Sequence, residues 1–229
     1  METDILSLYA TRPIVADMAV TSPIITGTTG MLKSLLTLAD VMPTGYHAAR
    51  VANVQKGDKV VVIGDGAVGQ CAVIAAKMRG ASQIVLMSRH EDRQQMALES
   101  GATAVVAERG EEGIVKVREI LGGGADAALE CVGTEAAVDQ ALGVLHNGGR
   151  LGFVGVPHYN NRALGSTFAQ NISVAGGAAS VTTYDKQVSE KSLEFYHKKQ
   201  KEKSECKDLL QTKELVSSTN SSEIITIPA

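Results

Sequence analysis

The chain of 229 residues has no tryptophan, and aromatic residues make up only 3% of it. It is therefore poorly suited to stack the bases of a single-stranded nucleic acid on aromatic side chains. Its formal net charge is −3, whereas proteins that bind nucleic acids by charge are usually basic. No stretch has the length and apolar density of a transmembrane helix. We expect neither a nucleic acid nor a membrane among its partners.

Cysteine is scarce as well. Cys71, Cys131 and Cys206 lie far apart, and no two of them have the CxxC spacing. The sequence thus supports neither a disulfide framework nor a structural zinc lobe. The first thirty residues also lack the basic start and the compact apolar run of a secretory signal peptide. A cytoplasmic location is the expectation that follows.

What the sequence does contain is 23 glycines and a regular alternation of apolar segments. The run KVVVIG is rich in β-branched residues, as expected for a strand buried on both faces. Runs of this kind predict strands at 59–64, 83–88, 104–107, 127–132, 149–156 and 171–178, and helical spacing predicts helices at 67–80, 92–101, 112–123 and 135–149. This alternation predicts an α/β fold with a doubly wound parallel sheet.

Composition divides the chain into three parts. Residues 1–34 have mixed polarity without a sustained period and are expected to form an irregular N-terminal segment. Residues 35–186 carry the alternating pattern and are expected to form one α/β domain. Residues 187–229 form a divergent charged tail, in which lysines are interleaved with glutamate as on a solvated helix face.

Gly64, Gly66 and Gly69 form the pattern G-x-G-x-x-G between the first predicted strand and the first predicted helix. In that context the pattern is typical of dinucleotide binding. Gly64 allows a tight turn, Gly66 leaves room for the pyrophosphate, and Gly69 lets the helix pack onto the strand. The helix N-terminus then offers free N–H groups to the phosphates. The alternative is a purely structural turn.

The second predicted strand ends at Ser88, where domains that bind NAD usually place an acid for the ribose 2′-hydroxyl. Serine removes the repulsion that an acid would exert on a 2′-phosphate. Arg89 offers a planar set of donors to phosphate, and Arg93 lies one helical turn further on. The pattern therefore predicts NADP rather than NAD. The alternative is that both arginines are ordinary solvated charges.

From about Leu35 to Asp185 the sequence resembles the cofactor domain of the medium-chain, zinc-dependent alcohol dehydrogenases. The resemblance is carried by LADVMPTGYHAARVANVQKGDKVVVIGDGAVG, AALECVG, HNGGRLGFVGVP and ISVAGG, in the same order and at matching spacings. It implies a Rossmann fold and the transfer of a hydride between NADP(H) and an alcohol, aldehyde or ketone. Small alcohols and aldehydes are then the expected substrates.

The resemblance also implies the positions of the site residues. It places cofactor-binding residues at Gly64, Gly66, Ala67, Val68, Gly69, Ser88, Arg89, Arg93, Val132, Gly133, Val154, Gly155 and Val156. Thr44 matches a threonine that touches the nicotinamide and is the candidate catalytic residue. Asp40 matches the third ligand of the catalytic zinc, which is a cysteine or an aspartate in the family.

The sequence departs from the family before this region. The family's other zinc ligands are a cysteine and a His-Glu pair, but this chain has no GHE and no cysteine before Cys71. Because a catalytic zinc needs three protein ligands, Asp40 alone does not hold one. A truncated or rearranged family member is the expectation.

Two alternatives to an alcohol dehydrogenase-like enzyme stay open. One is a non-catalytic NADP-binding module, and the other is a zinc-independent enzyme of the quinone-reducing branch. The last predicted strand, ISVAGG, lies at the end of the expected sheet. An open sheet edge invites pairing with a second copy, so a homodimer or tetramer is a further expectation.

Overall fold

Strands and helices alternate along the part of the chain that the computed structural model describes, which comprises residues 37, 40–159 and 165–179. The strands are β1 (Lys59–Ile63), β2 (Gln83–Met87), β3 (Ala104–Val106), β4 (Ala125–Glu130), β5 (Leu145–Phe153) and β6 (Ser173–Gly176). The helices are α4 (Val41–Val51), α5 (Ala67–Met78), α6 (Glu91–Ser100), α7 (Gly110–Leu121), α8 (Glu135–Gly143) and α9 (Gly165–Ala169).

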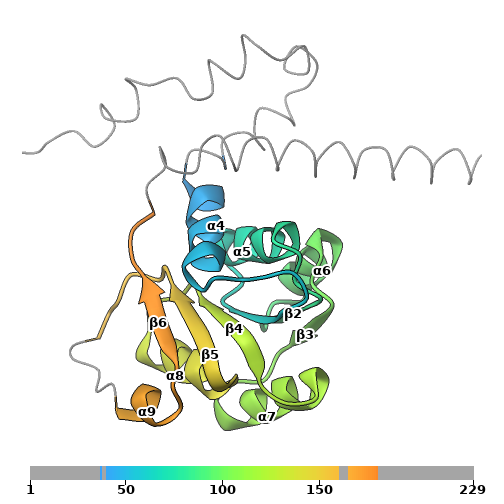
Figure 1. The fold of residues 1–229 in the computed structure, drawn as a ribbon. Helices are drawn as coiled ribbons and strands as arrows, with labels where there is room; N and C mark the ends of the chain where they lie inside the picture. Colours follow the sequence, from blue (N-terminus) through green and yellow to red (C-terminus); the bar gives the residue numbers. More distant parts are fainter. Residues whose placement is uncertain (1–36, 38–39, 160–164, 180–229) are drawn as a thin grey trace, which may run out of the picture. The chain divides into compact units, whose positions relative to one another are not determined.

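The six strands form one parallel sheet in the order β3-β2-β1-β4-β5-β6 (Figure 1). The chain moves outward from β1 to β3, then returns to the other side of β1 and continues to β6. This order confirms the predicted doubly wound Rossmann fold. The strand order reverses between β1 and β4, and open sheets of this type bind ligands at the carboxyl ends of the strands near that point.

Each face of the sheet is covered by its own hydrophobic cluster. On one face, Val60 and Val62 of β1 pack in a cluster with residues of α4 and α5. On the other face, Val61 and Ile63 pack in a cluster with residues of α7 and α8. All four side chains are at most 4% exposed. The continuous β-branched run of β1 is therefore explained by burial on both sides.

The C-terminal boundary predicted for the helix at 135–149 is wrong. The helix ends at Gly143, and β5 begins at Leu145, which pairs with Ala125 of β4. The register between the two strands then shifts before Arg150, so the residues between form a bulge. Gly148 in this bulge has φ +82°, which a right-handed helix does not accommodate.

Two further differences concern the rest of the chain. The sequence analysis assigned no helix to the residues of α4 or α9. The expected N-terminal segment 1–34 and the charged tail 187–229 lie outside the described residues, so those domain boundaries stay predictions. Within the described residues, every helix is too short or too polar to cross a membrane.

Candidate functional site

The turn after β1 has the shape that the glycine pattern predicts. Gly64 has φ +104°, a conformation that favours glycine. A Cβ atom at Gly69 would lie 1.9 Å from the carbonyl oxygen of Gly64, so the helix and the strand approach too closely for any side chain. A Cβ atom at Gly66 would meet nothing within 4 Å. Gly64 and Gly69 thus shape the turn, while Gly66 leaves the space in front of it open.

The N-terminus of α5 faces this open space without a competing group. Gly66 is the N-cap residue, and the first turn of α5 contains no acidic side chain. Gln70 donates the first helical hydrogen bond to the carbonyl of Gly66, at 2.9 Å. The N–H groups of Ala67, Val68 and Gly69 precede that bond and have no partner within the helix. Together with the partial positive charge of the helix end, they are suited to bind a phosphate.

Asp65 connects the glycine turn to the end of β2. The hydroxyl of Ser88 donates a hydrogen bond to Asp65 Oδ2 at 2.6 Å, and His90 Nδ1 lies 2.6 Å from the same oxygen. Arg93 donates from Nη1 to Asp65 Oδ1 at 3.0 Å. Gln94 adds a hydrogen bond to the carbonyl of Ser88. Sequence reasoning missed Asp65, although it lies between the first two glycines of the pattern.

These contacts keep Asp65 negatively charged. Burial raises the pKa of the carboxyl, but the hydrogen bonds from Ser88, His90 and Arg93 outweigh burial and lower the pKa to about 2. The side chain is only 13% exposed, so solvent screens these interactions weakly. A carboxylate therefore lies next to the end of β2, although the residue that follows the strand is Ser88.

The depressed pKa of Asp65 predicts a loss of stability in acid. Because the folded pKa lies below the unfolded one, the contribution is complete above pH ~4 and is lost as the pH falls through about 2. The shift corresponds to about 2 kcal/mol. In urea denaturation at several pH values, Asp65→Asn should lack this part of the acid dependence. Equal pH slopes in the parent chain and the variant would contradict the assigned contacts.

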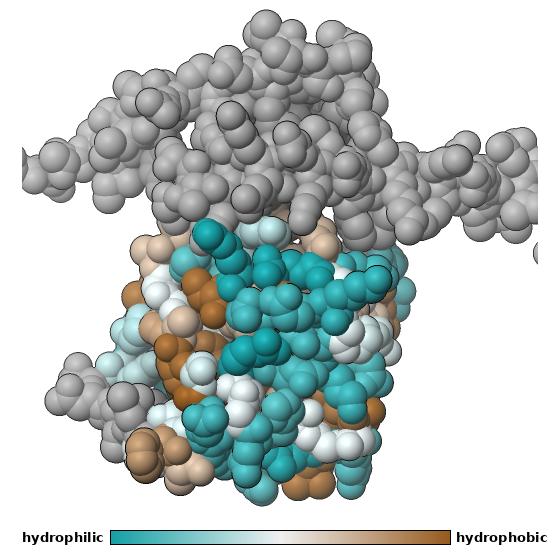
Figure 2. Space-filling model, viewed as in Figure 1, coloured by the Kyte–Doolittle hydropathy of each residue, from teal (hydrophilic) through white to brown (hydrophobic). Residues whose placement is uncertain are grey.

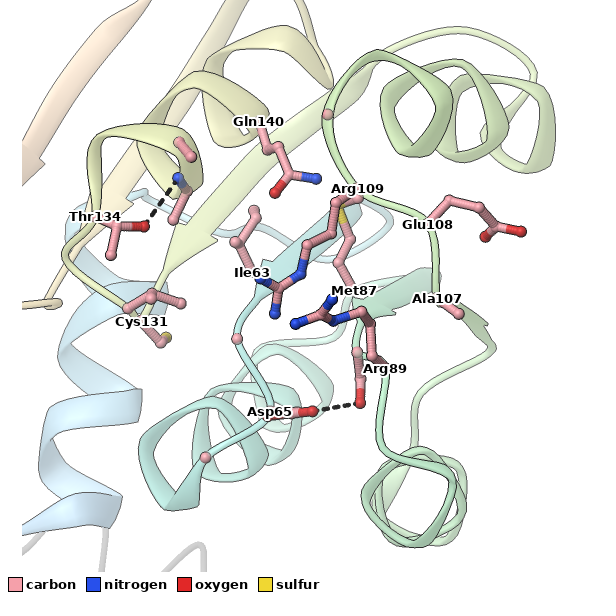
Figure 3. A pocket seen from close by; sticks show the side chains of 17 residues that line it. Ile63, Asp65, Met87, Arg89, Ala107, Glu108, Arg109, Cys131, Thr134 and Gln140 are labelled. Carbon is pink, nitrogen blue, oxygen red and sulfur yellow. Dashed lines mark hydrogen bonds between the residues drawn. The ribbon is translucent and has the colours of Figure 1, made fainter.

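A pocket of about 410 Å³ opens beside Asp65 at the carboxyl ends of the strands (Figure 3). Ile63, Met87 and Val132, from the ends of β1, β2 and β4, give it an apolar wall. Arg89 follows β2 and Arg109 follows β3, and both side chains point into the pocket (Figure 3). Sequence reasoning found Arg89 but missed Arg109, because the end of the third strand was not considered.

Some of the charged and amide groups around the pocket have a partner, and others do not. Among the described residues, the side chains of Arg89 and Arg109 make neither a hydrogen bond nor an ion pair. Glu108, the neighbour of Arg109, forms an ion pair with Lys116 of α7. Gln140 of α8 also lines the pocket; it is 8% exposed, and its Nε2 atom has no hydrogen-bond partner among the described residues. The pocket therefore has an apolar wall and unpaired cationic groups.

The loops after β4 and β5 pack backbone against backbone. A Cβ atom at Gly155 would lie 2.1 Å from the amide nitrogen of Gly133, and one at Gly133 would lie 2.0 Å from the carbonyl of Val156. Val132 lines the pocket, whereas Val156 is 70% exposed and does not. The structure thus brings the predicted segments Val132–Gly133 and Val154–Val156 together beside the switch point.

Asp40 and Thr44 lie at the start of α4 and are not among the residues that line the pocket. Asp40 is exposed and is the N-cap residue of α4, but its side chain accepts no hydrogen bond from the helix backbone. Thr44 donates a hydrogen bond from its hydroxyl to Asp40 Oδ1 at 3.3 Å. The helix packs against α5, β5 and β6 (Figure 1). The assigned roles of these two residues stay predictions.

The described residues do not fit a catalytic zinc. Between residues 40 and 179, excluding 160–164, no three His, Cys, Asp or Glu side chains gather closely enough to hold a metal. Burial raises the pKa of Cys71 to about 11, and burial also raises the pKa of Cys131. Both thiols are therefore protonated in the metal-free chain.

Comparison with known families decides where this parallel α/β fold belongs. The family model for zinc-binding dehydrogenases matches residues 67–197, more than half of the chain. The chain is a member of the zinc-binding dehydrogenase family. Two relatives illustrate the similarity. An alcohol dehydrogenase of Cupriavidus necator is 36% identical over 125 residues, which are 54% of this chain and 34% of the relative. A sorbitol dehydrogenase of Bacillus subtilis is 34% identical over 152 residues, which are 65% of this chain and 43% of the relative.

Solved structures of zinc-binding dehydrogenases share the fold. The alcohol dehydrogenase of Thermus sp. ATN1 superposes with a TM-score of 0.61 at 32% sequence identity. The match covers 66% of this chain and 45% of that one. The matched region of this chain thus spans less than half the length of these relatives.

Proposed function

We propose that this zinc-binding dehydrogenase domain binds NADP(H) and serves hydride transfer between an alcohol and an aldehyde or ketone. The main support is the juxtaposition of an open glycine turn with a pocket that contains unpaired arginines. The named activities of the relatives, alcohol and sorbitol dehydrogenase, support alcohols as the substrate class. When bound, the nicotinamide accepts or supplies the hydride.

We assign the residues that follow the strands to the different parts of the dinucleotide. Gly64, Gly66 and the free N–H groups that open α5 are assigned to the pyrophosphate. The sequence pattern assigns the 2′-phosphate to Ser88, Arg89 and Arg93; Ser88 and Arg89 line the pocket, whereas Arg93 donates a hydrogen bond to Asp65. Positions for the rest of the cofactor are assigned to Val132 and Gly133 on the adenosine side, and to Val154, Gly155, Val156 and Thr44 on the nicotinamide side.

Calorimetric titration with NADPH and NADH tests this proposal. A hydrogen bond to a charged group contributes about 1.5–3 kcal/mol. At ~1.4 kcal/mol per decade, one phosphate contact gives roughly 10- to 100-fold tighter binding of NADPH. The preference should shrink with added salt, because exposed charges are screened. Equal affinities for both cofactors would mean that the arginines do not bind the 2′-phosphate. If neither cofactor binds, the glycine turn has only a structural role.

Zinc content distinguishes a zinc-dependent alcohol dehydrogenase from the two alternatives, a non-catalytic NADP-binding module and a zinc-independent enzyme of the quinone-reducing branch. We predict well under one zinc per chain after dialysis, because Asp40 lacks the cysteine and histidine that complete the site in the family. Alcohol oxidation by the chain alone should then be very slow, since the alkoxide lacks a Lewis acid. Elemental analysis and NADPH-dependent turnover of an alcohol and aldehyde panel measure both. Stoichiometric zinc would point to overlooked ligands such as His47 or His158.

We also propose that β6 joins two copies of the chain in a homodimer, with a tetramer as the alternative. All four residues of β6 are exposed, and no described strand pairs with its outer edge. Val174 of β6 and Phe168 of α9 are exposed hydrophobic residues. Figure 2 shows hydrophobic patches on the side of the molecule where Figure 1 draws β6 and α9. Sedimentation or light scattering should show a dimer at micromolar concentration. A clean monomer at high concentration would count against edge pairing.

A further inference from the structure

We infer that Arg109, and not Arg93, is the second ligand of the cofactor's 2′-phosphate beside Arg89. This inference rests on the proposed function, since it assigns a residue to the NADP site. It concerns an arginine for which neither the glycine pattern nor the end of the second strand provides a signal.

The placement of Arg109 follows from the sheet. β2 and β3 are adjacent and parallel, and Met87 at the end of β2 pairs with Val106 at the end of β3. The residues that follow the two strands therefore leave the sheet at the same edge. Arg89 and Arg109 enter one pocket from these two neighbouring ends, and Figure 3 shows both side chains pointing into it.

The charge balance of the pocket calls for an anion. Neither guanidinium has a hydrogen bond or ion pair within the described part of the chain. The nearby acids already have cationic partners: both oxygens of Asp65 accept hydrogen bonds, and Glu108 forms an ion pair with Lys116 through Oε1, although its Oε2 has no hydrogen-bond partner among the described residues. Two cations that share a pocket repel one another, and a dianionic phosphate removes this repulsion. Planar guanidinium groups are also well suited to bind phosphate through two parallel hydrogen bonds.

Arg93 is placed differently. Its guanidinium donates to Asp65, and it is not among the residues that line the pocket. To reach a phosphate there, Arg93 would have to give up its contact with Asp65. Its role in the structure is to hold Asp65, and through Asp65 the glycine turn, against the start of α6.

The charges at the start of α7 weaken any contribution from the helix end. Gly110 lines the pocket at the N-terminus of α7, but Glu111 and Glu112 lie in the first turn of the helix. These acids oppose an anion, so the helix end alone does not make the site. The inference rests on the two arginine side chains.

Adenosine 2′,5′-bisphosphate and 5′-AMP are the probes that isolate this contact, because they differ only in the 2′-phosphate. Calorimetric titration of Arg109→Met should show about 10- to 100-fold weaker binding of the bisphosphate and unchanged binding of 5′-AMP. Arg93→Met is the matched control and should change the ratio of the two affinities by less than threefold. The side chain of Arg109 caps no helix and is exposed, so Arg109→Met should melt like the parent chain.

The possible results are distinguishable. If the parent chain binds both probes equally, the NADP proposal fails and this inference fails with it. If the parent prefers the bisphosphate and Arg109→Met keeps that preference, only the role of Arg109 is overturned. A loss of preference in Arg93→Met with none in Arg109→Met would restore Arg93 as the phosphate ligand.

Discussion

Replacing Gly66 with valine is expected to abolish binding of NADP(H) while leaving the melting temperature close to that of the parent chain. The backbone of Gly66 has φ −69° and ψ −177°, which a valine adopts readily. A Cβ atom there meets no protein atom within 4 Å, so the fold has room for it. The same open space is where the pyrophosphate must approach the helix N-terminus. Calorimetric titration and a thermal melt measure the two effects separately.

The matched control is Gly69→Val. A Cβ atom at Gly69 would lie 1.9 Å from the carbonyl oxygen of Gly64, so strand and helix would have to move apart. This variant should lose binding together with stability, with a melting temperature several degrees lower, since overpacking typically costs about 1–3 kcal/mol. If Gly66→Val binds NADP(H) as the parent does, the turn is structural and carries no dinucleotide.

The sequence predicted those parts of the fold that local patterns determine. The strand around Val60–Val62 is recognised because a run buried on both faces must be apolar throughout. The glycine turn is recognised because each of its positions requires glycine for a different reason. At Gly69, for example, helix and strand approach too closely for a side chain. The parallel pairing of the strands then follows from the alternation of helices and strands, which favours right-handed crossovers.

Other features depend on contacts between distant residues and left no local signal. The residues after Gly143 have helical spacing, but pairing of Leu145 with β4 makes them a strand. Asp65 and Ser88 lie 23 residues apart in the chain, and their hydrogen bond joins the ends of two strands. The shared pocket of Arg89 and Arg109 is a consequence of sheet order, which the end of one strand does not reveal.

The contact between Asp65 and Ser88 changes how cofactor preference should be reversed. The sequence alone suggests Ser88→Asp with Arg89→Ile, which supplies an acceptor for the ribose 2′-hydroxyl and removes a phosphate ligand. In the structure, however, the Ser88 hydroxyl lies 2.6 Å from Asp65 Oδ2. A second carboxylate there would face an aspartate whose pKa is about 2. Two like charges at 4 Å repel by about 4 kcal/mol at an effective dielectric of ~20. The double variant is therefore expected to bind both cofactors poorly.

Adding Asp65→Ala to that pair of changes should turn the preference to NAD(H). The triple variant moves the carboxylate from the glycine turn to the end of β2, where His90 and Arg93 are free to hold it. It also removes the Arg89 contact, so NADPH binding should weaken by roughly 10- to 100-fold. Titration of both cofactors into the parent chain, the double variant and the triple variant measures which cofactor each one prefers. Asp65→Ala alone is the control and should still prefer NADPH. A triple variant that still binds NADPH more tightly would show that Arg109 and its neighbours hold the phosphate without Arg89, and that the residue at 88 does not read the ribose.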